Sequence, residues 1–374
     1  MTKRIAFLVD SMAGGGAERV TLNLANEYCK QGYDVDLVLA HKQGPYLQNV
    51  DKDIRIVDLN VSRFWTYILP MVRYFRHEKP DVMLSATTIL NLIAILTKLV
   101  SFSKTHLVIS EHINIISFAK NGGLQRAKIV QVLMRWLYPR ANNIVAVSGG
   151  AADGISEFSD IPRDKITTIY NGVIDQHKLD LAQQPLNHPW FDEKRQLPVI
   201  VAVGRLQRQK NYEMLLGAFA ELLQQSKANL LILGEGELRE DLEKLAKKLG
   251  IEEYLSLHGF DENPFKYLAN ADLFVLSSLY EGLPTVLIEA LACGCPVVST
   301  NCPSGPEEIL NNGEFGRLTP VGNQHLFAKA MIQTLQEQNI DKQRLMDHGR
   351  HFNIDNAVVE YAKVLGINRQ ELSR

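Results

Sequence analysis

The sequence predicts an α/β protein with two doubly wound parallel sheets, one in each half of the chain. Three observations support this fold class. The chain has 374 residues, more than a single domain usually holds. Short runs rich in Val, Ile and Leu alternate with helix-like stretches along most of it. The alternation stops once and then starts again. We therefore expect two Rossmann-like domains joined by a linker.

The first half contains six strand-like runs separated by helical patterns such as residues 17–32. Near-continuous apolar runs are typical of parallel strands that helices cover on both faces. They predict an N-terminal domain over residues 1–172. The runs cover residues 4–9, 34–40, 54–59, 81–86, 106–110 and 143–148.

Residues 173–197 are polar, contain several prolines and lack periodicity, so we expect them to form the linker. The alternation then resumes and predicts a C-terminal domain over residues 198–351. A last helical pattern has no strand after it, so residues 352–374 are expected to form a C-terminal helix that packs back across the domain junction. The strand-like runs of this half cover residues 199–204, 229–234, 254–259, 272–278 and 296–300.

Composition excludes several classes of protein. The net charge is −2 and no recognition module is visible, which argues against nucleic-acid binding. The chain opens on a strand-like run without a signal-peptide pattern, and its longest apolar stretch (83–100) contains Thr, Asn and Lys, which favours a buried strand–helix pair over a membrane span.

The cysteines lack the paired C-x2-C spacing of a zinc site and predict free thiols in a reducing cytoplasm. They are Cys29, Cys293, Cys295 and Cys302.

The stretch SSLYEGLPTVLIEALACG, residues 277–294, combines a helix start with two acids. Pro284 suits a first helical turn and Gly294 suits a helix end. The amides of a helix start attract anions, whereas Glu281 and Glu289 repel them. If all eight steps between the acids were helical, they would span ~12 Å. A nucleotide sugar meets both requirements, because its diphosphate lies between two hydroxyl-rich sugars that carboxylates can bind.

Further residues at predicted strand ends suit the same ligand. Arg205 and Lys210 follow the first strand of the second domain and are well placed for a diphosphate. The alternative for these two cations is a solvated basic helix start. Glycine turns at 14–16, 233–240 and 257–260 let backbone groups approach a ligand, although tight turns and ordinary loops have the same composition.

At these residues the chain resembles glycosyltransferase family 4, whose members are retaining enzymes of GT-B fold. The resemblance rests on GGAER (15–19), SEHIN (110–114), YNGV (170–173), GRLQRQKN (204–211) and EGLPTVLIEA (281–290), and it covers nearly the whole chain. It implies two Rossmann-like domains facing each other across a cleft. The E-x7-E spacing after G-R-L-x3-K-N is its most specific element.

The resemblance also implies residue roles. Glu281 would face the donor hexose beside its anomeric carbon, and Glu289 would bind the ribose. Arg205 and Lys210 would clamp the pyrophosphate, and His112 would lie near the transferred sugar. The catalytic set is therefore Glu281, His112, Arg205 and Lys210. Arg205, Lys210 and Glu281 would also bind the donor. The other donor-binding residues would be Glu289, Gly15, Gly16, Ala17, Gly234, Glu235, Gly236, Phe260, Gly282, Leu283, Thr285 and Val286.

The family transfers its sugar with retention and without a metal, so neither a metal nor another cofactor is expected. The donor expected first is UDP-glucose and second a UDP-N-acetylhexosamine. The acceptor would be a saccharide or an undecaprenyl-linked glycan in surface polysaccharide synthesis. The mechanism favoured for the family is a front-face displacement; the sequence leaves a short-lived covalent adduct on Glu281 as the alternative.

Residues 61–140 contain eleven Lys or Arg against three Asp or Glu. Trp, Tyr and Phe are interspersed with these cations in residues 61–79 and 124–140, which suggests reversible docking on an anionic membrane. The alternative is ordinary amphipathic packing with a solvated basic face. With this docking, the expected location is the cytoplasm, peripheral to the inner face of the plasma membrane.

Three other functions fit parts of the sequence. A nucleotide-sugar 2-epimerase of the same fold would need acid and base groups around C2, and no such set can be assembled. A non-catalytic partner that only binds nucleotide sugars would not need the complete set of acids and cations. A metal-dependent transferase would need a D-x-D at a strand end, but Asp34–Val35–Asp36 starts its strand.

Overall fold

The computed structural model describes residues 3–61, 63–116, 119, 124–192 and 195–367. The chain divides into two compact units, which we call unit 1 (Met1–Gly172 and Ile354–Arg374) and unit 2 (Val173–Asn353). Each unit contains one parallel sheet, so the predicted α/β class is confirmed. Parts of the predicted stretches at 1–172, 61–79, 173–197 and 352–374 lie outside the described residues, namely 1–2, 62, 117–118, 120–123, 193–194 and 368–374.

Unit 1 contains a seven-stranded sheet in the order β3-β2-β1-β4-β5-β6-β7, and every pair is parallel. The strands are nearly continuous apolar runs because helices cover both faces. The sequence analysis missed β7, whose three residues are too few for a periodic signal. The strands are β1 (Arg4–Val9), β2 (Asp34–Leu39), β3 (Arg55–Asp58), β4 (Val82–Ala86), β5 (His106–Glu111), β6 (Asn143–Ala146) and β7 (Ile166–Thr168).

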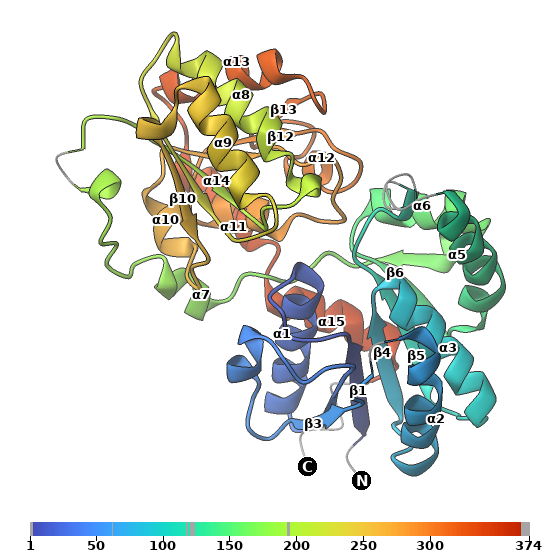
Figure 1. The fold of residues 1–374 in the computed structure, drawn as a ribbon. Coiled ribbons are helices and arrows are strands. Elements are labelled where there is room, and N and C mark those ends of the chain that lie inside the picture. Colours follow the sequence, from blue (N-terminus) through green and yellow to red (C-terminus); the bar gives the residue numbers. More distant parts are fainter. Residues whose placement is uncertain (1–2, 62, 117–118, 120–123, 193–194, 368–374) are drawn as a thin grey trace. The chain divides into compact units, whose positions relative to one another are not determined.

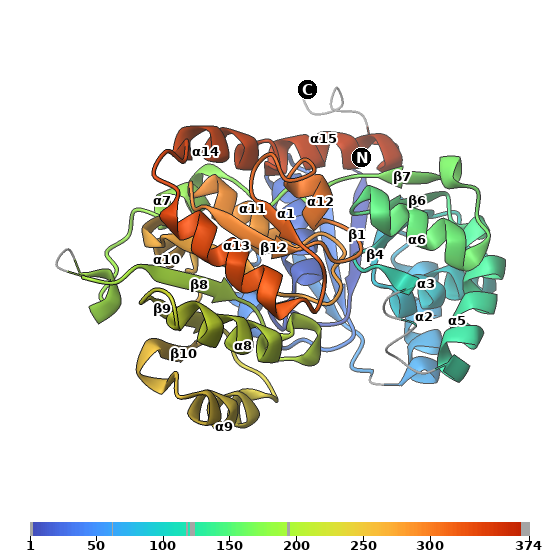
Figure 2. The same cartoon turned by 90° about the horizontal axis from the view of Figure 1, so that it is seen from above.

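Helices cover both faces of this sheet (Figure 1). One face forms a large core with α2, α3, α5 and α6, in which Leu8, Met83 and Ile109 meet Phe75 and Ile93. The other face contacts α1 and α15, as Figure 2 shows from above. The helices of unit 1 are α1 (Gly16–Lys30), α2 (Ile68–His77), α3 (Thr88–Ser101), α5 (Leu124–Leu137), α6 (Gly149–Ser159) and α15 (Ile354–Leu365), with short 3-10 turns at Pro45–Asn49, Phe64–Tyr67, Tyr138–Arg140 and Arg163–Lys165.

The sheet of unit 2 has six parallel strands in the order β10-β9-β8-β11-β12-β13. Its main core lies between this sheet and α8, α9 and α13. The three-residue strand β13 was missed for the same reason as β7. The strands are β8 (Val199–Val203), β9 (Asn229–Leu233), β10 (Leu255–Gly259), β11 (Leu273–Leu276), β12 (Val297–Thr300) and β13 (Arg317–Thr319).

Eight α-helices complete the described part of unit 2. They are α7 (Gln176–Leu181), α8 (Tyr212–Leu223), α9 (Arg239–Leu249), α10 (Phe265–Asn270), α11 (Thr285–Ala292), α12 (Pro306–Ile309), α13 (Gln324–Gln336) and α14 (Lys342–Arg350). Short 3-10 turns cover Pro189–Phe191, Arg208–Lys210 and Glu252–Tyr254.

The expected linker is attached to unit 2. It contains α7 and a 3-10 turn, and Asn263 Nδ2 donates to Leu181 O over 2.9 Å. The C-terminal helix α15 follows unit 2 in sequence but packs on unit 1. Tyr28 OH donates to Val358 O over 2.9 Å, and His106 Nε2 lies 2.8 Å from Val364 O.

Two further expectations concern membrane spans and cysteines. Among the described residues, no helix has both the length and the apolar character needed to cross a bilayer. All four cysteines are free thiols. Burial raises the pKa of Cys293 and of Cys302 to about 12, so both thiols are protonated and unreactive near neutral pH.

Candidate active site

Glu281 lies in the loop between β11 and α11, at the carboxyl end of the unit 2 sheet. The residue is 8% exposed, and its carboxylate accepts three side-chain hydrogen bonds. Oε1 accepts from Lys210 Nζ over 2.7 Å and from Ser278 Oγ over 2.6 Å. Oε2 accepts from Gln209 Nε2 over 3.3 Å. The structure therefore joins two of the predicted site residues, Glu281 and Lys210, as a largely buried ion pair.

The loops that carry this pair are fastened to each other. Gln209 donates through Nε2 to Tyr280 O over 2.9 Å and accepts at its carbonyl from Leu279 N over 2.8 Å. Ser277 Oγ donates to Lys210 O over 2.6 Å. Because these bonds cross between the loop after β8 and the loop after β11, Glu281 is positioned by backbone groups as well as by its own partners.

Helix α11 follows directly. Pro284 is the N-cap residue of α11, whereas the sequence analysis placed it in the first helical turn. Gly294, with φ of +72°, follows the end of the helix as predicted. Since the helix begins at Thr285, Glu281 precedes it, and a continuous helix does not join the two acids. Glu289 is buried in α11, as its apolar neighbours suggested. The predicted residues Gly282, Leu283, Thr285 and Val286 form the loop and the first turn.

Close backbone approach explains why glycines follow the neighbouring strands. A Cβ on Gly234 would lie 2.1 Å from Gly204 O, and one on Gly236 would lie 2.4 Å from Leu206 O. The loops after β8 and β9 are therefore in direct contact, and Leu206 N donates to Glu235 O over 2.9 Å. Side chains at either glycine would push these loops apart.

Three of the residues predicted to bind the sugar donor, all in strand-end loops of unit 2, differ in their surroundings. The Arg205 side chain is exposed, and no pairing with another described residue is found for it. Phe260, just after β10, is 52% exposed and offers an aromatic face. The Glu235 carboxylate instead pairs with Arg239, with Oε1 2.6 Å from Nη2.

The remaining predicted residues belong to unit 1. Gly15, Gly16 and Ala17 form the start of α1, where Gly15 is an N-cap without a side-chain hydrogen bond. A Cβ on Gly15 would lie 2.1 Å from Glu18 Oε2, so the Glu18 carboxylate folds over this helix start. A phosphate that approached these amides would have to displace it.

His112 follows β5 directly. Its Nε2 lies 3.1 Å from Ser110 Oγ, whereas its buried Nδ1 has no hydrogen-bond partner among the described residues. Burial lowers the pKa of His112 to about 4, because a charged imidazole is poorly solvated there. The ring is therefore neutral at physiological pH.

Sequence reasoning missed Glu111, the neighbour of His112. Its fully buried carboxylate accepts from Thr88 Oγ1 over 2.9 Å, from Asn91 Nδ2 over 3.0 Å and from Tyr138 OH. Burial raises the pKa of Glu111, and these hydrogen bonds oppose the rise. The network ties the start of α3 and the turn after α5 to the strand end that carries His112. A charged residue in an apolar strand was the only signal of it in the sequence.

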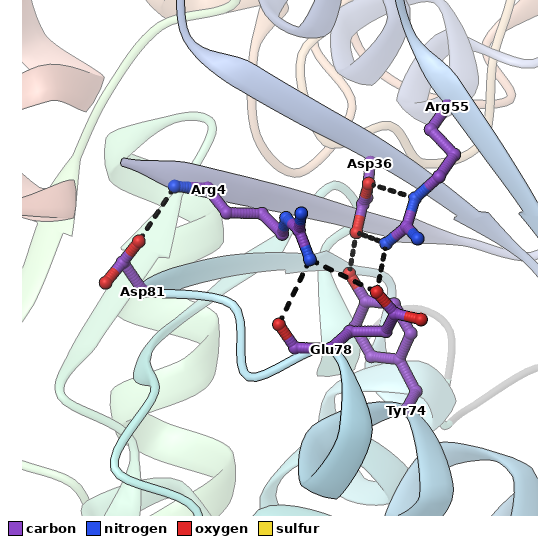
Figure 3. A network of polar contacts seen from close by, with 6 residues as sticks. All are labelled: Arg4, Asp36, Arg55, Tyr74, Glu78 and Asp81. Atoms are coloured by element: carbon purple, nitrogen blue, oxygen red, sulfur yellow. Dashed lines mark hydrogen bonds and ion pairs between the residues drawn. The ribbon is translucent and has the colours of Figure 1, made fainter. Parts of the chain in front are cut away.

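Asp36, the second acid of the D-x-D in β2, belongs to a network of ion pairs and hydrogen bonds (Figure 3). Asp36 is 2% exposed and accepts a fork from Arg55, with Nη2 2.6 Å from Oδ2, and a hydrogen bond from Tyr74 OH. Glu78 accepts from both Arg55 and Arg4. These residues lie near the amino ends of β1, β2 and β3, the edge opposite to the strand ends that carry His112.

Comparison with known proteins agrees with this geometry. The protein-family model described as "Glycosyltransferase Family 4" matches residues 14–177. The family model described as "Glycosyl transferases group 1" matches residues 185–352. A solved structure of HepE from Anabaena with UDP-glucose superposes with a TM-score of 0.77 at 18% identity, covering 97% of this chain and 99% of HepE. The two sheets and their strand-end loops thus define a glycosyltransferase of GT-B fold.

Two curated relatives come from Campylobacter jejuni. The first is N-acetylgalactosamine-N,N'-diacetylbacillosaminyl-diphospho-undecaprenol 4-alpha-N-acetylgalactosaminyltransferase, 30% identical over 351 residues, with 91% of this chain and 92% of the relative covered. The second, 26% identical, transfers alpha-1,4-N-acetyl-D-galactosamine to a GalNAc-containing undecaprenol-linked glycan and is covered over 98% of its length and 97% of this chain. The chain belongs to glycosyltransferase family 4.

Proposed function

We propose that the protein is a retaining, metal-independent glycosyltransferase that moves a hexose from a UDP-sugar to an undecaprenyl-linked glycan. Activity as a glycosyltransferase follows from the family; the donor, the stereochemistry, the absence of a metal and the acceptor are proposals. The observation that carries them is the buried Lys210–Glu281 pair beside the start of α11. This pair places a cation and a carboxylate next to helix amides that can bind phosphate.

In this proposal the cationic groups replace a metal ion. The exposed Arg205 guanidinium forms a fork for the diphosphate. The Lys210 ammonium has two more N–H groups besides the one that donates to Glu281, and these can also bind the diphosphate. Amides of the first turn of α11 add further donors to the same oxygens. Together they stabilise the negative charge that grows on the leaving UDP. Glu289 binds the ribose, and the turn at Gly234–Gly236 with Phe260 receives the base.

Glu281 positions the hexose and stabilises positive charge at its anomeric carbon. The bonds from Lys210, Ser278 and Gln209 hold its carboxylate in place, which favours a fixed electrostatic role over nucleophilic attack. A front-face displacement, in which a donor phosphate oxygen takes the proton of the acceptor hydroxyl, fits this arrangement. Both Campylobacter relatives are named for alpha linkages, the outcome of retention from an α-linked UDP-sugar.

The relatives favour one donor sugar over the other. Both transfer N-acetylgalactosamine, whereas UDP-glucose is bound in the structure of HepE, a more distant protein. We therefore rank UDP-N-acetylhexosamines first and UDP-glucose second, the reverse of the order expected from the sequence. The same names support a lipid-linked glycan as acceptor.

Calorimetric titration in EDTA tests the donor site. The titrants are UDP, GDP, UDP-N-acetylgalactosamine and UDP-glucose. We expect UDP and one UDP-sugar to bind, and Glu289→Ala to weaken UDP binding by at least tenfold, about 1.4 kcal/mol. The matched control is Glu307→Ala, an exposed acid of α12 in the same unit. Binding that requires a divalent ion, or a preference for GDP, would contradict the proposal.

Product analysis tests the reaction. An undecaprenyl-diphosphate-linked oligosaccharide ending in N-acetylgalactosamine is incubated with the donor that binds, and NMR determines the new anomeric linkage. An alpha linkage supports retention, and a beta linkage refutes it. A changed sugar at C2 would instead reveal an epimerase, and binding without any product would reveal a non-catalytic partner.

Reversible membrane docking is the second part of the proposal. The turn before α2 exposes Trp65, and α5 exposes Ile129, Val132 and Trp136 among basic residues. Helix α3 contacts both α2 and α5, so these helices form one side of unit 1 (Figure 2). Arg135 pairs with Asp160, which reduces the local positive charge but leaves the aromatic residues available.

Vesicle co-sedimentation tests this docking. We expect binding to vesicles rich in anionic lipid, weaker binding to neutral ones, and loss of binding in high salt or in Trp65→Ser/Trp136→Ser. Equal binding to both vesicle types, or none to either, would favour ordinary packing with a solvated basic face.

A further inference from the structure

A chain of hydrogen bonds runs from His112 to the C-terminal helix. Ser110 Oγ lies 3.1 Å from His112 Nε2 on one side and 3.3 Å from Tyr361 OH on the other. Ser110 and Tyr361 are both fully buried. Tyr361 belongs to α15 and follows Ser110 by 251 residues in sequence. A residue from the end of the chain thus reaches the predicted catalytic histidine through one serine.

The direction of these bonds follows from counting protons. The serine hydroxyl has one proton, so it donates either to His112 Nε2 or to Tyr361 OH. If it donates to Nε2, Tyr361 donates to Ser110, and only the Nδ1–H of His112 lacks a partner among the described residues. In the reverse direction the Tyr361 proton and the Nδ1 lone pair both lack partners there. Because an unpaired buried polar group is costly, the first direction is favoured.

The charge states of both end groups agree with this direction. Burial lowers the pKa of His112 to about 4, so its ring is neutral and exists as one of two tautomers. Burial raises the pKa of Tyr361 to about 12, while its bond to Ser110 opposes the rise. The tyrosine therefore keeps its proton and can donate it. A neutral imidazole that accepts at Nε2 must have its proton on Nδ1.

We propose that Tyr361 and Ser110 are positioning residues that fix His112 as the Nδ1–H tautomer, so that Nδ1 can donate a hydrogen bond to an oxygen of the transferred sugar. This inference rests on the proposed transferase function and on the place beside the transferred sugar that the family resemblance implies for His112. The opposite tautomer would present a lone pair at Nδ1, which could accept a hydrogen bond from a sugar hydroxyl but could not donate one. The end of α15 thus determines whether the histidine donates to the substrate or accepts from it.

The attachment of α15 can be separated from this effect. Tyr28 OH donates to the Val358 carbonyl of the same helix, and His106 Nε2 contacts the Val364 carbonyl. Neither bond involves Ser110 or His112. Tyr28→Phe therefore removes one buried tyrosine hydroxyl from the α15 interface, as Tyr361→Phe does, but leaves the hydrogen bonds of His112 in place. It is the matched control.

The tautomer is read directly by long-range ¹H–¹⁵N NMR of histidine-labelled protein. The protein contains ten histidines, so the His112 signals are assigned by their loss in His112→Gln. We expect a single Nδ1–H tautomer in the wild type and in Tyr28→Phe. Tyr361→Phe and Ser110→Ala should both give a mixture of tautomers. This measurement needs neither donor nor acceptor, so it remains decisive even if the proposed transferase reaction is not found.

Kinetics test the contact with the sugar. Using the UDP-sugar that binds in the titration, we expect Tyr361→Phe and Ser110→Ala to lower kcat about tenfold with less than a twofold change in the donor KM, and Tyr28→Phe to change neither. The inference is overturned by an unchanged tautomer in Tyr361→Phe and Ser110→Ala, or by equal effects of Tyr28→Phe. A changed tautomer without a change in kcat also overturns it, because Nδ1 then does not serve the reaction.

Discussion

At the scale of single residues, the ion pair between Glu281 and Lys210 is the central feature of the candidate site. The side chains of both residues are largely buried, so each compensates the charge of the other in a poorly solvated place. Both residues could be identified from their motifs in the sequence. Their direct contact could not, because 71 residues separate them and the sequence does not specify which loops touch.

Removal of one partner should therefore cost more than removal of both. We expect Lys210→Met to lower the free energy of unfolding of unit 2 by about 3 kcal/mol, because it leaves a buried charge without compensation. The double variant Lys210→Met/Glu281→Gln should recover most of this loss. Urea denaturation of the four proteins in the cycle measures it. Additive losses in the double variant would mean that the two side chains do not interact.

The pKa of His112 predicts how the stability of the protein depends on pH. Its pKa is about 4 in the folded protein, below the unfolded value of about 6.5, so the unfolded state binds more protons between these values. The contribution of His112 to stability therefore falls as the pH drops below about 6.5, by about 2 kcal/mol at pH 5.

The His112→Gln variant removes this dependence. Denaturation at pH 7 and pH 5 should show that the wild type loses more stability than His112→Gln over this interval, since all other titrating groups are shared. Equal losses in the two proteins would show that the imidazole remains solvated in the folded state.

At the scale of elements, the strands could be predicted well and the loops between them less well. Strands of four or more apolar residues give a clear pattern, whereas β7 and β13 have three residues each and give none. The start of α11 was placed one residue early because proline suits both the N-cap region and the first turn. The networks around Glu111 and Ser110 join distant elements, so local patterns contain no signal for the partners.

The turn before α11 depends on a glycine in the next loop. Gly305 has a φ of +93°, and a Cβ there would lie 2.5 Å from Pro284 Cδ. We expect Gly305→Ala to lower the free energy of unfolding by about 3 kcal/mol and to weaken UDP binding, because the loop that carries Glu281 must move.

The control for this variant is Gly322→Ala in the same unit. Gly322 also has a positive φ, of +75°, but its Cβ would meet no atom within 4 Å. Gly322→Ala should therefore lower the free energy of unfolding only through its strained backbone, by about 1 kcal/mol, and should bind UDP normally. Equal effects of the two variants in urea denaturation and calorimetry would contradict a role for the Pro284 contact.

At the scale of the whole molecule, the sequence predicted two sheet-containing halves because the alternation of patterns stops and restarts. It did not predict that the residues after the stop would be attached to unit 2, since α7 and its neighbouring turn have weak periodicity. Nor did it reveal which unit holds the last helix. That assignment depends on hydrogen bonds from Tyr28, His106 and Ser110 to α15, each more than 250 residues away in sequence.

Truncation after Asn353 tests the dependence of unit 1 on α15. The shortened chain would expose the face of β4 and β5 that α15 covers. We expect limited proteolysis to degrade unit 1 of this chain and to leave a resistant fragment of unit 2. The full-length protein should resist under the same conditions, and equal resistance of unit 1 in both would show that α15 contributes little.

The return of α15 to unit 1 also has a consequence for biosynthesis. A ribosome makes residues 1–172 before unit 2, yet α15, which covers part of one face of their sheet, is translated only after unit 2. All of unit 2 is translated in the interval, and it can fold while the first unit waits with one face uncovered. Nascent chains of this protein therefore contain an exposed apolar surface until α15 has left the ribosome, and the hydrogen bonds of His112 are completed only at that point.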